Sequence, residues 1–180
     1  MAHLETPSVR WQASFLDALA EFHGEGTLLN YEMIALRRDF PAFVRLIVGY
    51  SRGERLPPGF IPSTDFWLID DDEFIGRVSI RHELTEGLRR IGGHIGYQIR
   101  PTKRRLGHGT RILALALPKA RELGLTRVLV TCDETNIGSR KIIEANGGEF
   151  ENAVDLEDGS PRKLRYWIQI DTEIPPSSGP

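Results

Sequence analysis

The stretch that decides the fold is Arg100-Pro-Thr-Lys-Arg-Arg-Leu-Gly-His-Gly-Thr110, where two glycines follow a run of basic residues. The residues after it have apolar side chains at the spacing of one helical face, and Gly124 then provides a C-terminal stop. The apolar face consists of Leu113, Ala116, Leu117, Ala120 and Leu123. We therefore predict that the two glycines lie at the N-terminus of a helix that runs to about residue 123.

A helix N-terminus that begins with glycines is suited to binding an anion. The first backbone N–H groups have no partner inside the helix, and the helix dipole adds partial positive charge. Gly107 and Gly109 lack the Cβ atom that would keep an oxyanion away from these amides. Local positive charge comes from Lys103, Arg104, Arg105 and Arg111. The pattern predicts a bound diphosphate.

The same residues are also compatible with a segment that binds no ligand. The glycines could simply form a tight turn before a helix, with the basic side chains as a solvated rim, and the segment alone leaves this open. A dinucleotide fingerprint would need a glycine at position 112, which is Ile112, and a P-loop would need a lysine soon after the second glycine. Neither of these two nucleotide motifs is present.

The strands expected around this loop give a β-hairpin that leads into a βαβ unit. Residues 66–70 and 74–80 are β-like runs joined by an acidic turn, and a glycine-containing loop leads to a third run at residues 94–100. The helix follows, and then a fourth run at residues 127–131. The glycine-rich loop thus lies between two strands.

Beyond this unit, the pattern predicts helices before it and a second hairpin after it. Helical periodicity covers about residues 10–50, and prolines at 57, 58 and 62 force an irregular connection. The second hairpin pairs residues 149–156 with 163–170. We expect one domain over residues 1–172, with its motif-bearing core at about 66–170, and a disordered tail at 173–180.

Composition limits the classes of partner. The 180 residues carry 23 basic and 25 acidic side chains and a net charge of −2, so no overall field would attract nucleic acid or an anionic membrane. The single Cys132 cannot form an intrachain disulfide, and the first residues lack the features of a secretory signal. No apolar run approaches the roughly 20 residues of a membrane span. A cytoplasmic protein is expected.

Three motifs in consistent order resemble those of the GNAT acetyltransferase superfamily. Arg104-x-x-Gly107-x-Gly109 resembles the R/Q-x-x-G-x-G/A pyrophosphate loop, and Asn136-x-x-Ser139 resembles the N-x-x-S/A helix that follows the fifth strand. His94-Ile-Gly-Tyr97 resembles the E-I-G-Y strand of the branch with ribosomal-protein and antibiotic acetyltransferases.

The chain departs from the family pattern at three positions. His94 stands where that branch often has Glu, and Ile143 stands where many members have Tyr. Pro118 falls inside the helix after the loop, where it is expected to bend the helix without touching its first turn.

The resemblance implies an α/β fold with a mixed, largely antiparallel sheet flanked by helices, in which the βαβ unit carries the CoA pyrophosphate loop. It implies acetyl-CoA as co-substrate, no metal, and an amine acceptor that attacks directly in a ternary complex. A backbone N–H near Gln98 or Ile99 would stabilise the oxyanion. The residues expected to bind CoA are Gln98, Ile99, Arg104, Arg105, Leu106, Gly107, His108, Gly109, Thr110, Asn136 and Ser139.

The reaction needs a group that accepts the proton of the amine and a group that protonates the CoA thiolate. A lysine-type amine with a pKa of about 10.4 must lose a proton, and we expect His94 to accept it. Glu83, expected on the neighbouring strand, is the second candidate. His94 could instead be an ordinary packed strand histidine. Ser139 or Tyr166 could protonate the CoA thiolate, although Ser139 could simply be a helix residue and Tyr166 strand packing.

Other functions stay open beside the enzyme. A non-catalytic acyl-CoA sensor would keep the loop but turn over no amine. A nucleic-acid module is disfavoured, because the basic cluster is short and has no interleaved aromatic residues. Nothing in the sequence distinguishes a small-molecule acceptor from a peptide or protein, and a homodimer is possible.

Overall fold

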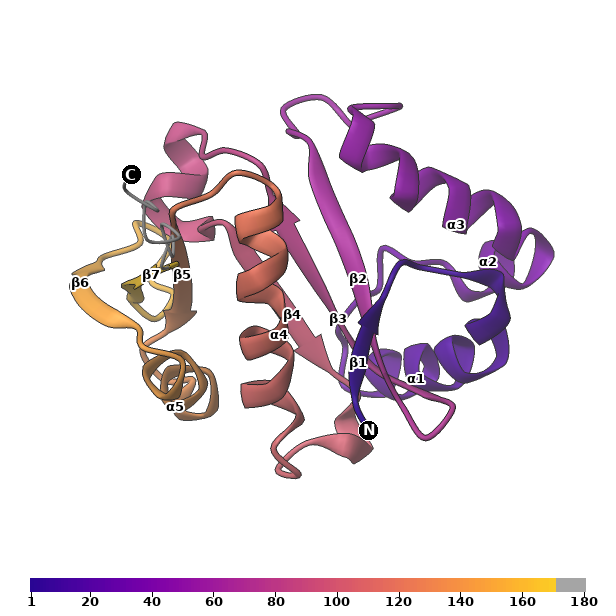
Figure 1. Cartoon of the computed structure of the whole chain (residues 1–180). Coiled ribbons are helices and arrows are strands. Elements are labelled where there is room, and N and C mark those ends of the chain that lie inside the picture. Colours follow the sequence, from indigo (N-terminus) through magenta and orange to yellow (C-terminus); the bar gives the residue numbers. More distant parts are fainter. Residues whose placement is uncertain (171–180) are drawn as a thin grey trace, which may run out of the picture.

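The structure, a computed structural model, describes residues 1–170 of the chain, so the predicted tail at 173–180 lies outside it. Four strands form an antiparallel sheet in the order β1-β2-β3-β4 (Figure 1). Their bounds are β1 His3–Glu5, β2 Ser63–Asp70, β3 Glu73–Arg81 and β4 Ile95–Ile99. Strands β2 to β4 confirm the three predicted runs. β1 was not predicted, because three residues are too few to show alternation.

A second antiparallel sheet has the order β5-β7-β6. Its strands are β5 Arg127–Asp133, β6 Glu149–Val154 and β7 Lys163–Gln169, which confirm the fourth run and the second hairpin. Helix α4 (His108–Glu122) connects β4 to β5 and continues through Pro118. The predicted fold class is confirmed, but β4 and β5 belong to different sheets, a division that the sequence pattern did not reveal.

Helices cover both faces of the first sheet (Figure 1), so the side chains of β2 point into two different cores. Leu68 points into a core shared with α4 and the second sheet, whereas Trp67 and Ile69 point into a separate core built with the N-terminal helices. In that second core the Phe15 ring stacks on Trp67, with 4.7 Å between ring centroids. The other helices are α1 Gln12–Gly24, α2 Met33–Arg38, α3 Phe40–Gly49 and α5 Ile137–Ala145.

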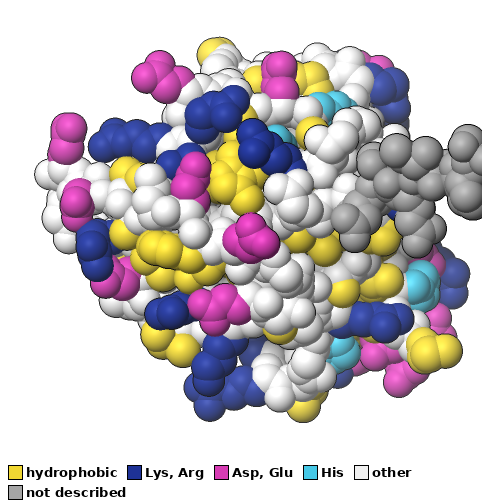
Figure 2. Space-filling view, turned by 60° about the vertical axis from the view of Figure 1, so that its left-hand side comes forward, with side chains coloured by type: hydrophobic (Ala, Val, Ile, Leu, Met, Phe, Trp, Pro, Cys, Tyr) yellow, Lys and Arg dark blue, Asp and Glu magenta, His cyan; other side chains and the backbone are white. Residues whose placement is uncertain are grey.

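Short helical turns join these elements. Pro41 lies in the first turn of α3, which Asp39 caps by accepting a hydrogen bond from the Ala42 N–H, so this proline begins a new helix. The turns are 3-10 at Val9–Trp11, Tyr50–Arg52 and Pro101–Lys103, and π-type at Leu88–Gly92. Within residues 1–170, no helix has the length and apolar character needed to span a membrane. Basic and acidic side chains are interspersed over the face in Figure 2.

The C-terminal end of α1 is tied to the segment before the glycine-rich loop. The Glu21 carboxylate accepts hydrogen bonds from Arg100 Nε at 2.7 Å, from the Thr102 N–H at 3.1 Å and from Thr102 Oγ1 at 2.8 Å. Burial alone would raise the pKa of Glu21, but the Thr102 and Arg100 bonds hold it below its usual range. Glu21 therefore stabilises the fold in its ionised form.

We predict that Glu21→Gln lowers the free energy of unfolding at pH 7 by about 1–3 kcal/mol, as is typical for losing hydrogen bonds to a charged group. Because the folded-state pKa of Glu21 is depressed, its contribution is present above the unfolded pKa of about 4.5 and is lost as pH falls through the folded value. Denaturant unfolding of parent and variant should therefore differ at pH 7 and converge in acid. Glu122→Gln, which breaks an exposed pair with Lys119, is the control and should change little. Equal losses for both variants would contradict the prediction.

Candidate active site

The glycine-rich loop leads into the N-terminus of α4, as the sequence predicted. Gly107 is the N-cap residue with φ +85°, and nothing lies within 4 Å of the position that a Cβ would occupy there. The first i→i−4 bond of this helix runs from Arg111 N to Gly107 O, at 3.0 Å. The N–H groups of His108, Gly109 and Thr110 precede that bond and therefore have no partner in the helical ladder. The result is an open, donor-rich helix start.

Gly109 has a second reason to be glycine. A Cβ at this position would come 2.4 Å from Ile142 Cδ1 on α5. Gly109 therefore allows the close approach of α4 and α5, in addition to any close approach of a ligand. The sequence suggested only the ligand.

The basic residues of the loop are not equivalent. Arg104 pairs with Glu25 beyond the end of α1 at 2.8 Å, and its Nε donates to Ile99 O at 3.1 Å. Lys103 pairs with Glu73. The exposed Arg105, with φ +61°, makes no ion pair with any residue of the described chain. Of these three cations, Arg105 is the one whose charge is not matched by a carboxylate.

Hydrogen bonds between His94 and Leu129 join β4 to β5, and beyond them the two strands belong to different sheets; we call this region between β4 and β5 the gap. Helix α5 begins beside it, next to β4. Asn136 is its N-cap and accepts a hydrogen bond from Ser139 N at 2.9 Å. The Ser139 hydroxyl lies 2.9 Å from the Tyr97 hydroxyl of β4, so a pair of hydroxyls joins β4 to α5. Burial raises the pKa of Tyr97 to about 12, against the opposing effect of the Ser139 bond, so Tyr97 keeps its proton at pH 7.

Sequence reasoning named Ser139 but missed Tyr97 as a functional residue. Tyr97 shares a face of β4 with Ile95 and Ile99, and it packs against the core formed with α4. The alternation along this strand was the available signal, but it does not tell which α5 residue meets the hydroxyl.

β4 is the last strand of its sheet, so its outer edge faces the gap. Arg100 N donates to Ile75 O of β3, and backbone groups alternate in direction along an antiparallel strand. The Gln98 N–H therefore points toward β3, and the Ile99 N–H points toward the gap. Of the two predicted oxyanion donors, Ile99 has the suitable direction.

His94 joins the two sheets. Its backbone N–H donates to Leu129 O at 2.7 Å, and its ring Nδ1 accepts from Leu129 N–H at 2.9 Å. Since a backbone N–H can only donate, Nδ1 must be unprotonated and the neutral ring carries its hydrogen on Nε2. Burial, and then the charges of Arg89, Arg81 and Arg127, lower the pKa of His94 to about 4. At pH 7 the ring is neutral and its Nδ1 lone pair is already used.

The other two catalytic candidates lie elsewhere. Glu83 is exposed and comes two residues after the end of β3, not on the strand as expected. Tyr166 is buried on β7, where its hydroxyl donates to Glu144 at 3.4 Å. In residues 1–170 no hydrogen bond joins either of them to His94 or to the Tyr97–Ser139 pair.

Sequence and structure comparisons relate this chain to known proteins. A model of the acetyltransferase (GNAT) domain matches residues 54–149, just over half of the chain. RimJ from Mycobacterium smegmatis, in complex with CoA-disulfide, is similar in structure, with TM-score 0.69 and 20% identity over 97% of this chain and 84% of that one. A search of curated protein sequences finds no match.

Two further solved structures are similar to the chain. RimL, a ribosomal L7/L12 alpha-N-protein acetyltransferase in complex with coenzyme A, has TM-score 0.66 and 14% identity, covering 94% of both chains. The aminoglycoside acetyltransferase AAC(6')-Ib, in complex with coenzyme A and kanamycin, has TM-score 0.63 and 12% identity, covering 94% of this chain and 95% of that one. At these identities the likeness shows a common fold.

The family model spans strands β2 to β5, the glycine-rich loop and helices α4 and α5, and the solved structures agree in fold over nearly the whole chain. The chain therefore belongs to the GNAT family of acetyltransferases.

Proposed function

We propose that the chain is an acetyl-CoA-dependent N-acetyltransferase in which the acceptor amine, of a small molecule or of a peptide or protein, attacks directly in a ternary complex. The observation that carries this proposal is the position of the open N-terminus of α4, which follows β4 where the two sheets separate and the Tyr97–Ser139 pair joins β4 to α5. Acetyl-CoA supplies an activated thioester there when bound.

The residues at the loop fit a CoA diphosphate. The N–H groups of His108, Gly109 and Thr110 precede the first helical hydrogen bond, and Gly107 leaves the space beside them open. Arg105 offers a guanidinium that no carboxylate of the described chain neutralises. Arg104 holds the loop against Ile99 and Glu25, so we propose a positioning part for it as well as charge.

Further along the gap, other groups of the chain can serve the thioester end. The Ile99 N–H points into the gap, where it can stabilise the negative charge that develops on the carbonyl oxygen. Ser139 is the proposed proton donor to the leaving thiolate, and Tyr97, which keeps its own proton, orients the Ser139 hydroxyl. Tyr166 is less suited, because its ring is buried and its hydroxyl donates to the exposed Glu144.

For the proton of the amine, the geometry favours a changed assignment. His94 could accept a proton at Nδ1 only by giving up the Leu129 N–H, and its low pKa makes it a weak base at pH 7. We propose that His94 positions β4 against β5 and that Glu83, which forms no ion pair within residues 1–170, is the candidate base.

Two classes of acceptor amine are suggested by analogy with proteins of similar structure. RimL is a ribosomal-protein acetyltransferase, whereas AAC(6')-Ib is an aminoglycoside acetyltransferase. Both kinds of amine therefore belong in a first test of this chain.

CoA should raise the melting temperature of the parent protein, because a ligand that binds only the folded state stabilises it, by about 2.7 kcal/mol at 100 times Kd. Gly107→Ala should lose most of this shift. The matched control is Gly124→Ala: the two glycines have φ of +85° and +87° and open space around the Cβ position, so both variants carry the same backbone strain. Equal CoA shifts in the two variants would refute the loop assignment. Gly109→Val is unsuitable, because the new side chain would strike Ile142.

Release of free thiol from acetyl-CoA should depend on an added amine, tested with a protein N-terminal peptide, kanamycin and a polyamine. Ser139→Ala and Tyr97→Phe should lower kcat, by up to about 10²–10⁴-fold for Ser139 as general acid, while CoA affinity by calorimetry stays near that of the parent. Tight CoA binding without turnover of any amine would instead favour the non-catalytic acyl-CoA sensor.

His94→Asn should keep most of the rate and stability of the parent, because Asn Oδ1 can take the place of Nδ1 and accept from Leu129 N–H. His94→Ala should lower the free energy of unfolding by about 1–3 kcal/mol, since the buried Leu129 N–H loses its partner. If His94 were the base, both variants would lose the rate and the acidic limb of the pH profile alike. Loss of that limb in Glu83→Gln alone would assign the base to Glu83.

A further inference from the structure

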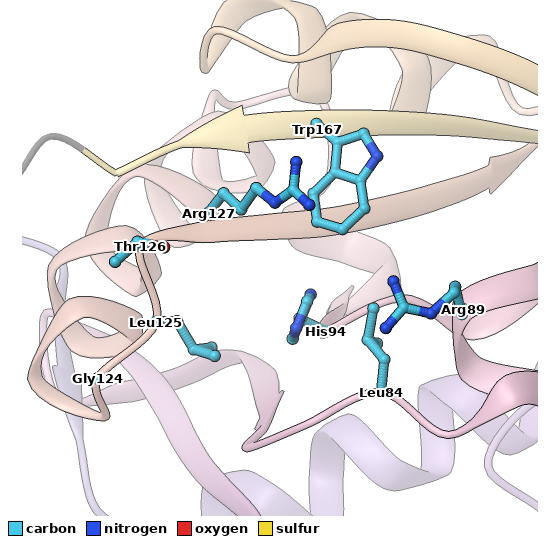
Figure 3. Close-up of a pocket in the computed structure, with 8 residues that line it drawn as sticks. All are labelled: Leu84, Arg89, His94, Gly124, Leu125, Thr126, Arg127 and Trp167. Carbon is cyan, nitrogen blue, oxygen red and sulfur yellow. The ribbon is translucent and has the colours of Figure 1, made fainter.

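A pocket of about 240 Å³ lies beside the junction of the two sheets, between His94, Trp167 of β7 and the segment 124–127 that leads from the end of α4 into β5 (Figure 3). Its apolar walls are Leu84, Leu125 and Trp167. Trp167 and Arg127 alternate along their strands with Ile168 and Val128, which point into the core shared with α4. The pocket is therefore distinct from the glycine-rich helix start.

One buried polar group opens into this pocket. His94 is 7% exposed, its Nδ1 is used by Leu129, and its hydrogen is on Nε2. Nε2 has no hydrogen-bond partner among the described residues, and His94 is part of the pocket lining. Within residues 1–170 this N–H is not a buried atom, so it is open to the pocket and can donate a hydrogen bond to a ligand there.

Two arginines add positive charge at the rim. The guanidinium of Arg127 lies 4.3 Å from the centre of the Trp167 ring, and Arg89 lies on the other side of His94 (Figure 3). Neither arginine forms an ion pair with any residue in the described part of the chain. The charges that act on His94 all come from arginines, namely Arg81, Arg89 and Arg127, and Arg81 is itself occupied by the carbonyls of Gly92 and Gly93. The pocket thus has positive charge without a counterion from residues 1–170.

We propose that this pocket binds a small carboxylate with a short apolar or aromatic body. Guanidinium groups present planar pairs of N–H donors that match a planar carboxylate, and the Nε2–H of His94 supplies a further donor. Trp167 and the two leucines can contact the apolar body. Pockets for drug-sized ligands measure about 300–1,000 Å³, so a smaller molecule suits this one. The proposal does not depend on the acetyl-transfer activity.

The test uses calorimetry of the full chain in Tris chloride with benzoate, and with benzamide as the neutral counterpart of the same shape. Benzoate should bind in the millimolar range or tighter, and benzamide at least about fivefold more weakly, because it lacks the charge that the arginines recognise. Inorganic phosphate is the second anion. Phosphate that bound while benzoate did not would overturn the carboxylate assignment.

Arginine variants test whether benzoate binds in this pocket. Arg89→Gln and Arg127→Gln should each weaken benzoate binding at least about fivefold, whereas Arg90→Gln, the matched control on the same exposed turn, should not. Benzoate should also shift the ¹⁵N signal of His94 Nε2 at pH 7, and benzamide should shift it less. Benzoate binding that is unchanged in both arginine variants, or that leaves the His94 signal in place, would place the ligand elsewhere and refute the proposal.

Discussion

The structure depends on how its two sheets are held together where no continuous ladder joins them. Both backbone polar groups of Leu129 bind one residue, since its carbonyl accepts from His94 N–H and its N–H donates to the His94 ring. An imidazole nitrogen thus takes the place that a strand carbonyl would have in a ladder. From this junction β4 and β5 run in separate sheets, and the Tyr97–Ser139 pair joins β4 to the start of α5 beyond it. The proposed site uses this part of the molecule, together with the start of α4.

The N-terminal helices contribute to this gap although they carry no motif of their own. Glu21 and the nearby Glu25 hold Arg100, Thr102 and Arg104, so the loop that begins α4 is fixed from α1 as well as from β4. Much of the positive charge that marks this segment in the sequence is therefore neutralised within the fold. The anion-binding potential comes from the backbone N–H groups and from Arg105, which pairs with no carboxylate of residues 1–170.

The sequence predicted what depends on neighbours along the chain. The strands of the hairpins, the extent of α4 and the glycines at its start follow from alternation, helical spacing and capping, which are local properties. The role of His94 could not be predicted, because its ring partner lies 35 residues away, and neither could the occupation of Arg104 by Glu25, 79 residues away. The sequence showed Tyr97 only as part of a motif. Its contact with the Ser139 hydroxyl could not be predicted, because the two residues are 42 positions apart.

Gly93, next to His94 at the junction, has a φ of +67°, and a Cβ there would lie 2.5 Å from Leu129 O. At the end of the gap where His94 binds Leu129, the two backbones are therefore in direct contact, and this contact requires that residue 93 has no Cβ. For the evolution of acyl specificity this means that the narrow end cannot be adjusted by exchanging side chains. In the proposed site, a descendant of this chain that used a bulkier thioester would have to gain room elsewhere along the gap, for example by shortening Tyr97 or by moving the first turn of α5.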